Sequence, residues 1–179
     1  MAEKIMRRLR LSRSMIECVR SVITHHLRPG NLAACALVTE RAAYRFLRDT
    51  SPHALSLLLV AWSDHAGYMP LAGLLRHLPR THEDPNTSDL SSLRPSSAQK
   101  TIRHLQVVTH LLCSHLKLSR ARPQQLADGH DVMRALKVKP GPDVGKALES
   151  LREAQALGRV RTREEALKFL TSLRSRAGR

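Results

Sequence analysis

Apolar residues recur at three- and four-residue steps along most of this chain, and this spacing constrains the fold more than any other feature. Residues 12–27 carry one such stripe, and residues 102–116 carry a longer one. Spacing of this kind places apolar side chains on one face of an α-helix. The alternation with a period of two that is typical of strands is missing from the sequence. We therefore predict an all-α fold, a helical bundle of about eight to ten helices.

Proline and glycine indicate where the first helices begin and end. Pro29-Gly30 is expected to stop the helix over residues 12–27. Ser51-Pro52 is expected to open a strongly apolar helix that ends near Gly67. Because this helix is the most apolar in the first half of the chain, we expect it to form the centre of the core.

A polar segment divides the sequence into two helical regions. Residues 79–97, PRTHEDPNTSDLSSLRPSS, are rich in Pro, Ser, Thr, Asp and Asn and have almost no apolar side chains. Such a composition is typical of a flexible loop or a domain boundary. We therefore expect one helical region over residues 1–78 and another over residues 98–179. In the second region, Pro142 suits a first helical position, and Thr162 with Glu165 fits a capping box.

The charge of the chain indicates the class of partner. Thirty Lys and Arg face fifteen Asp and Glu, which gives a formal net charge of +15 and a pI near 11.1. Such an excess favours polyanions, and nucleic acid above all. No apolar run approaches the roughly twenty residues that span a bilayer, and the N-terminus lacks the apolar segment of a secretory leader. We expect a cytoplasmic protein with no membrane partner and with its three cysteines reduced.

Several motifs in a fixed order resemble a known family. Residues 129–170, GHDVMRALKVKPGPDVGKALESLREAQALGRVRTREEALKFL, resemble the C-terminal region of bacterial CCA-adding tRNA nucleotidyltransferases and related poly(A) polymerases. Upstream, RRLRLS, HHLRP, RAAYRFLRDT and SDHAG resemble the second half of the HD-type helical domain of the same enzymes. The resemblance implies a truncated HD-type domain over residues 1–78, followed by a helical tail that contacts tRNA.

The catalytic head of that family has no counterpart in this sequence. The family's glycine-serine motif and paired metal-binding aspartates are absent, and carboxylate-held magnesium is what phosphoryl transfer requires. We therefore expect no nucleotidyltransferase centre in this chain and no polymerisation by the chain alone. One hypothesis is that the chain works beside a separately encoded catalytic chain. The alternative is that the chain is the remnant of a truncated gene.

An incomplete metal site of the HD type is a second hypothesis. Only Asp64 in SDHAG matches the family's ligand set, with His25 and His26 as auxiliary ligands, because Met1 falls after the positions of the first ligands. Mixed imidazole and carboxylate ligands would suit Mg or Mn, and the chain would then be a metal-dependent phosphohydrolase. The alternative is that these side chains make helix-end and interhelical hydrogen bonds. For His130-Asp131, which lies outside the HD-type region, we predict a helix start, with Asp128 as its cap or Asp131 in its first turn.

Basic residues are the candidates for RNA contact. Near Lys139, a KPGP turn opens a helix, where free amides and lysines attract a phosphate, although Asp143 would oppose it and the turn would also serve helix geometry alone. Because aromatic residues are scarce, we expect readout of shape and backbone rather than stacking on single-stranded bases. The predicted RNA-binding residues are Arg7, Arg8, Arg10, Arg13, Lys137, Lys139, Lys146, Arg159, Arg161 and Arg163.

Three functions thus remain open from the sequence. The first is a tRNA-binding portion of a CCA-adding family protein, the second is the phosphohydrolase, and the third is a helical interaction module whose charge serves solubility. Truncation would also uncover apolar faces over residues 15–23 and 55–62, which predicts a homodimer or docking onto a catalytic chain.

Overall fold

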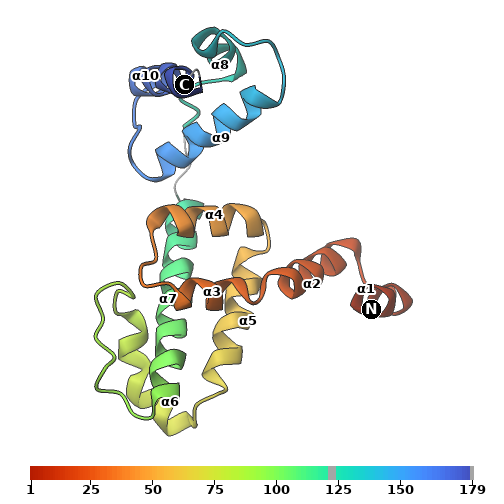
Figure 1. Cartoon of the computed structure of the whole chain (residues 1–179). Coiled ribbons are helices and arrows are strands. Elements are labelled where there is room, and N and C mark those ends of the chain that lie inside the picture. Colours follow the sequence, from red (N-terminus) through yellow and green to blue (C-terminus); the bar gives the residue numbers. More distant parts are fainter. Residues whose placement is uncertain (121–123, 178–179) are drawn as a thin grey trace. The chain divides into compact units, whose positions relative to one another are not determined.

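The computed structural model describes residues 1–120 and 124–177. These residues form ten α-helices and one short 3-10 helix, with no strand among them (Figure 1). The prediction of an all-α fold is therefore confirmed. Within the same residues, no helix combines the length and the apolar composition that crossing a bilayer requires.

The chain divides into two compact units, Met1–Lys117 and Leu118–Arg179. The first contains α1 (Ala2–Arg8), α2 (Arg13–His25), α3 (Arg28–Ala34), α4 (Glu40–Thr50), α5 (Ala54–Ala66), α6 (Leu71–His77), η1 (Leu78–His82) and most of α7 (Ser96–Arg120). The second contains α8 (Gly129–Leu136), α9 (Pro142–Ala156) and α10 (Arg163–Ala177).

The core of the first unit is built on α5 and α7. Leu57 and Leu58 of α5 are fully buried, which confirms the expected central position of this helix. On α7, Ile102 and Leu105 are fully buried and pack with Ala66. The apolar stripe of α7 is buried over its first half, whereas Leu116 near its end is exposed.

Hydroxyl side chains set the starts of two helices in this unit. Ser12 precedes α2 and accepts a hydrogen bond from the Met15 amide. Thr39 precedes α4 and accepts one from the Ala42 amide. The prediction that Pro29-Gly30 stops a helix was wrong in one respect. The helix over residues 13–25 does end before this dipeptide, but Pro29 lies in the first turn of another helix, α3, where the missing proline amide costs nothing.

The polar segment over residues 79–97 is a packed part of the first unit and not its boundary. The Asn86 side chain accepts a hydrogen bond from the Val38 amide at 2.8 Å and donates one to the Val38 carbonyl at 3.0 Å. Gln106 of α7 donates to the Arg80 carbonyl at 2.9 Å, and Leu93 lies in the core cluster of Ile102. Polar side chains here supply hydrogen-bond partners for backbone groups, so their abundance did not indicate a flexible loop. The division between the units lies instead after Lys117.

Two imidazoles stack in the core between α5 and α7. The rings of His65 and His104 lie 3.3 Å apart between centroids, with an angle of 15° between their planes. His104 is buried, and its Nε2 atom has no hydrogen-bond partner. Burial, together with the neighbouring His65, lowers the pKa of His104 to about 4, although Asp64 near the pair acts in the opposite direction. His104 is therefore neutral at pH 7.

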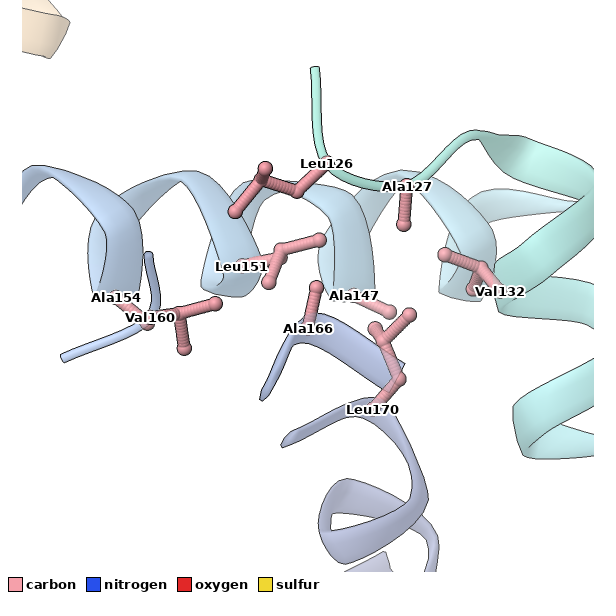
Figure 2. Close-up of a cluster of buried hydrophobic side chains, with 9 residues drawn as sticks. All are labelled: Leu126, Ala127, Val132, Ala147, Leu151, Ala154, Val160, Ala166 and Leu170. Atoms are coloured by element: carbon pink, nitrogen blue, oxygen red, sulfur yellow. The ribbon is translucent and has the colours of Figure 1, made fainter. Parts of the chain in front are cut away.

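The second unit folds around nine small and branched apolar side chains (Figure 2). Val132 comes from α8, Leu151 from the middle of α9, and Leu170 from α10, and all three are buried. Leu126, in the segment before α8, covers the same cluster. Each helix is too short to be stable alone in water, so the helices of this unit depend on this shared core.

The start of α8 is fixed by a reciprocal pair of aspartates. Asp128 accepts a hydrogen bond from the Asp131 amide at 2.9 Å, and the Asp131 carboxylate accepts one from the Asp128 amide at 3.2 Å. The Asp131 carboxylate is buried and also lies 2.7 Å from Arg134 and 2.9 Å from Arg163 at the start of α10. The backbone amide of Asp128 first, and then the two guanidinium groups, hold the pKa of Asp131 below its usual range. The interpretation of His130-Asp131 as a helix start is confirmed.

The remaining predicted helix signals of this unit are confirmed as well. Pro142 occupies the first turn of α9. Thr162 accepts a hydrogen bond from the Glu165 amide, and the Glu165 carboxylate accepts one from the Thr162 amide, both at 3.2 Å. This capping box begins α10.

Replacing Asp131 with alanine should destabilise the second unit alone. The change leaves two guanidinium groups without their shared buried carboxylate and removes half of the helix cap, at a cost of about 3 kcal/mol in the free energy of unfolding. Urea unfolding followed by circular dichroism should show an earlier transition. Trp62 is the single tryptophan and lies in the first unit, so its fluorescence transition should be unchanged. A shift of the fluorescence transition by the same amount would contradict the independence of the two cores.

The first unit should lose stability as the pH falls from about 6.5 to about 4 because of His104. Its folded pKa lies below its unfolded value, so the unfolded chain binds the extra proton across this window, and stability is full above it and lost within it. The expected loss is about 3 kcal/mol, measured by urea unfolding with Trp62 fluorescence. His104→Phe keeps an aromatic ring at this position without the proton site, and its curve should be flatter. Equal pH dependence in both proteins would contradict this assignment.

Candidate nucleic-acid interface

The turn between α8 and α9 presents two lysines to solvent. Lys137 ends α8 in the left-handed conformation, with φ of 56°, and the next amide, that of Val138, donates to the Met133 carbonyl at 3.2 Å. The side chains of Lys137 and Lys139 are exposed. The structure thus places two of the predicted RNA-binding residues on one short, ordered turn.

The second turn of α9 contributes a third lysine. Lys146 pairs with Asp143 at 3.0 Å, and the two side chains are 77% and 71% exposed. An exposed pair of this kind is worth little, so a phosphate can replace the aspartate as the partner of Lys146. Pro142 has no amide hydrogen, and the Val144 amide already donates to the Gly141 carbonyl at 3.1 Å. Two backbone positions at this helix start are therefore not available to an anion, whereas the three lysine side chains are exposed.

The turn between α9 and α10 holds Arg159 and Arg161. Gly158 adopts a left-handed conformation with φ of 68°, where a side chain would be strained. The Arg161 guanidinium donates to the Gly158 carbonyl at 3.2 Å, and its backbone amide donates to Glu165 at 2.6 Å. Both arginine side chains remain exposed on this well-anchored turn.

Arg163 has a different role from the other predicted RNA-binding residues. One of its terminal nitrogens donates to Asp131 at 2.9 Å, and the other donates to the Leu126 carbonyl at 3.3 Å. These bonds tie α10 to the start of α8. Although 59% of its side chain is exposed, Arg163 is engaged in holding the fold and is not a free cation.

The predicted N-terminal arginines lie on α1, on the turn after it and at the start of α2. Arg7 pairs with Glu3 at 2.7 Å, and Arg13 pairs with Glu17 at 2.9 Å. The other two, Arg8 and Arg10, are exposed. The four arginines were predicted as equivalent cations, whereas Arg7 and Arg13 have carboxylate partners one helical turn away.

The candidate metal ligands do not form a cluster. Asp64 is 62% exposed and lies 3.6 Å from the Nδ1 atom of His65. His26 makes a helix-end hydrogen bond to the Ile23 carbonyl at 2.8 Å, and His25 ends the same helix, α2. Across residues 1–120 and 124–177, no group of three or more His, Cys, Asp or Glu side chains could hold a metal ion.

Two features of the structure were not predicted from the sequence. One is Arg20, which lies beside the paired arginines of α1 and α2. Its position seven residues after Arg13 puts both on nearly the same helix face, a signal that could have been used. The other is the stacked pair of His65 and His104, and because these residues are far apart in sequence, no local pattern indicates it.

Comparison with known proteins finds similarity to tRNA nucleotidyltransferases over part of the chain. Residues 94–170 match the family model described as tRNA nucleotidyltransferase domain 2. Over 49 residues the chain is 55% identical to a CC-adding tRNA nucleotidyltransferase of Thermus thermophilus, which is 27% of this chain and 11% of that protein. Over 76 residues it is 37% identical to an A-adding tRNA nucleotidyltransferase of Deinococcus radiodurans, which is 42% of this chain and 18% of that protein.

These matches are partial. A CC-adding tRNA nucleotidyltransferase of Geobacter sulfurreducens is 51% identical over 45 residues, which is 25% of this chain and 10% of that protein. The matched stretches thus span between a tenth and a fifth of the length of these relatives. No solved structure matches the chain. Over residues 94–170, the chain is therefore similar to the tRNA nucleotidyltransferase family, and these residues include most of the C-terminal motifs on which the predicted resemblance rests.

Proposed function

We propose that this chain binds tRNA by its folded shape and its phosphate backbone, as a part of a tRNA nucleotidyltransferase system. The observation that carries the proposal is the position of the exposed lysines and arginines of the second unit. Lys137, Lys139, Arg159 and Arg161 lie on the two turns that join α8, α9 and α10, within the segment that matches the tRNA nucleotidyltransferase family.

The charge of these turns supports contact with phosphates. The formal net charge of the chain is +15, and partner phosphates release counterions when lysines and arginines neutralise them. The two turns are held by capping interactions at Lys137 and Gly158, so their side chains project from a fixed backbone. A fixed backbone lowers the entropy that is lost on binding.

The aromatic residues support readout of shape rather than of unpaired bases. The chain has only two Phe, two Tyr and one Trp. Phe46 is buried, and Tyr44 and Trp62 are half-buried in helices. Single-stranded RNA is usually held by aromatic side chains on which successive bases stack. Folded RNA held by its backbone fits the cations and the scarcity of exposed rings.

A separate nucleotidyltransferase chain is the proposed source of the transfer chemistry. The family's glycine-serine motif and metal-binding aspartates are absent from this sequence. Exposed apolar side chains support docking onto such a chain, among them Met15 of α2 and Leu59 of α5, which are 51% and 53% exposed. Large exposed apolar side chains on neighbouring helices are typical of protein contact surfaces.

Neutralising the three lysines at the turn between α8 and α9 and at the start of α9 should weaken tRNA binding without changing sequence preference. Log affinity falls linearly as log salt rises, and each phosphate contact adds roughly one to the magnitude of this slope. We therefore expect the triple variant Lys137→Gln, Lys139→Gln, Lys146→Gln to reduce the magnitude of the slope by about two to three. Fluorescence anisotropy with labelled tRNA at several salt concentrations measures the slope. Arg76→Gln, on exposed α6, is the matched control and should bind as the unchanged protein does. Unchanged binding by the triple variant would remove this turn from the RNA interface.

A further inference from the structure

A cleft between α1 and α2 gathers charged side chains outside the segment that matches the family. Its volume is about 590 Å³, and its lining includes three arginines and two glutamates. These are Arg7, Arg13, Arg20, Glu3 and Glu17. The turn between the two helices contains Arg10, which adopts a left-handed conformation with φ of 55°.

The turn at Arg10 is closed by two backbone hydrogen bonds. The Arg10 amide donates to the Arg7 carbonyl at 3.0 Å, and the Leu11 amide donates to the Met6 carbonyl at 3.1 Å. These bonds are the pattern that ends a helix at a left-handed residue. The buried side chains of Met6 and Ile16 lie on the two helices, and Ile16 lines the cleft. The cleft is therefore part of the packed arrangement of α1 and α2.

Two of the three arginines have carboxylate partners, and the third has none. Arg7 donates two hydrogen bonds to Glu3, at 2.7 and 3.0 Å, and Arg13 donates one to Glu17 at 2.9 Å. In the part of the chain that the structure describes, Arg20 makes no ion pair. The hydrogen bond from Arg7 chiefly lowers the pKa of Glu3, and the nearby charge of Arg20 lowers it further. The cleft thus holds one positive charge in excess, on Arg20.

The chemistry of the cleft suits a phosphate. A guanidinium group presents paired donors that match phosphate oxygens. The paired arginines are held by glutamates one helical turn away, with the Arg7 and Arg13 side chains 70% and 93% exposed, so these pairs can open at little cost. A phosphate in the cleft would therefore meet one free guanidinium and two that can turn toward it.

We propose that the cleft between α1 and α2 binds a phosphate of the RNA backbone through Arg20, with Arg7 and Arg13 as flanking contacts. This proposal rests on the proposed function, since it adds a second contact region in the first unit to the lysine and arginine turns of the second. Glu3 and Glu17 have an opposing effect. They hold the flanking arginines in place, and they weaken the attraction of the cleft for anions.

Because arginine attracts a phosphate and glutamate repels it, replacing each should change tRNA affinity in opposite directions. We expect Arg20→Gln to reduce the magnitude of the slope of log affinity against log salt by about one, and to weaken tRNA affinity about threefold in low salt. Glu17→Gln removes a negative charge and frees Arg13. We therefore expect it to strengthen tRNA binding and to make the fall of affinity with salt steeper. Both are measured by fluorescence anisotropy on the full chain. Circular dichroism of each variant should match the unchanged protein, because all the replaced side chains are on the surface.

The outcomes separate this proposal from the proposed function. Weaker binding by Arg20→Gln together with stronger binding by Glu17→Gln supports the cleft. If both variants bind as Arg76→Gln does, while the triple lysine variant is weakened, the cleft is not an RNA site and the proposed function stands. If the triple lysine variant also binds normally, the proposed function fails as well. Weaker binding by both Arg20→Gln and Glu17→Gln would overturn the charge argument for the cleft.

Discussion

The buried carboxylate of Asp131 determines how the second unit is assembled. It accepts hydrogen bonds from the Asp128 amide and from two guanidinium groups, those of Arg134 and Arg163. These contacts join the start of α8 to the start of α10, and Arg163 also reaches the Leu126 carbonyl in the segment before α8. A buried charge without such partners would be costly, so the carboxylate specifies one arrangement of these elements. The turns that carry the exposed cations depend on this arrangement.

The same structure divides the cations of a strongly basic chain by their roles. Arg163 holds the fold, whereas Lys137, Lys139 and Arg159 are exposed on ordered turns. Net charge alone cannot make this distinction, because it counts every lysine and arginine alike. The proposed RNA surface therefore rests on cations that are exposed, including Lys146 in its exposed pair with Asp143, and leaves out Arg163, which holds a buried carboxylate. In the first unit, Arg20 differs from Arg7 and Arg13 because it makes no ion pair in the described part of the chain.

Local signals in the sequence were sufficient to predict most helices and their caps. Apolar spacing indicated α2 and α7, and the Thr162–Glu165 capping box indicated the start of α10. Features that depend on contacts between distant residues could not be predicted in this way. Arg163 pairs with a carboxylate 32 residues earlier, and Asn86 clamps a backbone segment 48 residues earlier. The polar composition of residues 79–97 predicted a flexible loop, but the structure shows that Asn86 accepts a hydrogen bond from the part-buried Val38 amide and that Gln106 of α7 donates one to the Arg80 carbonyl. The family motifs predicted tRNA as the partner class, but could not separate exposed arginines from those that hold the fold.

The central claim is that the chain recognises folded RNA through phosphate contacts. The most direct test compares binding of the purified chain to tRNA and to an unstructured RNA of equal length across a salt series, with the metal content of the same preparation assayed in parallel. We expect tighter binding to tRNA, with affinity that falls steeply as salt rises. An absence of RNA affinity, together with a tightly held divalent metal, would contradict it and favour a metal-dependent hydrolase.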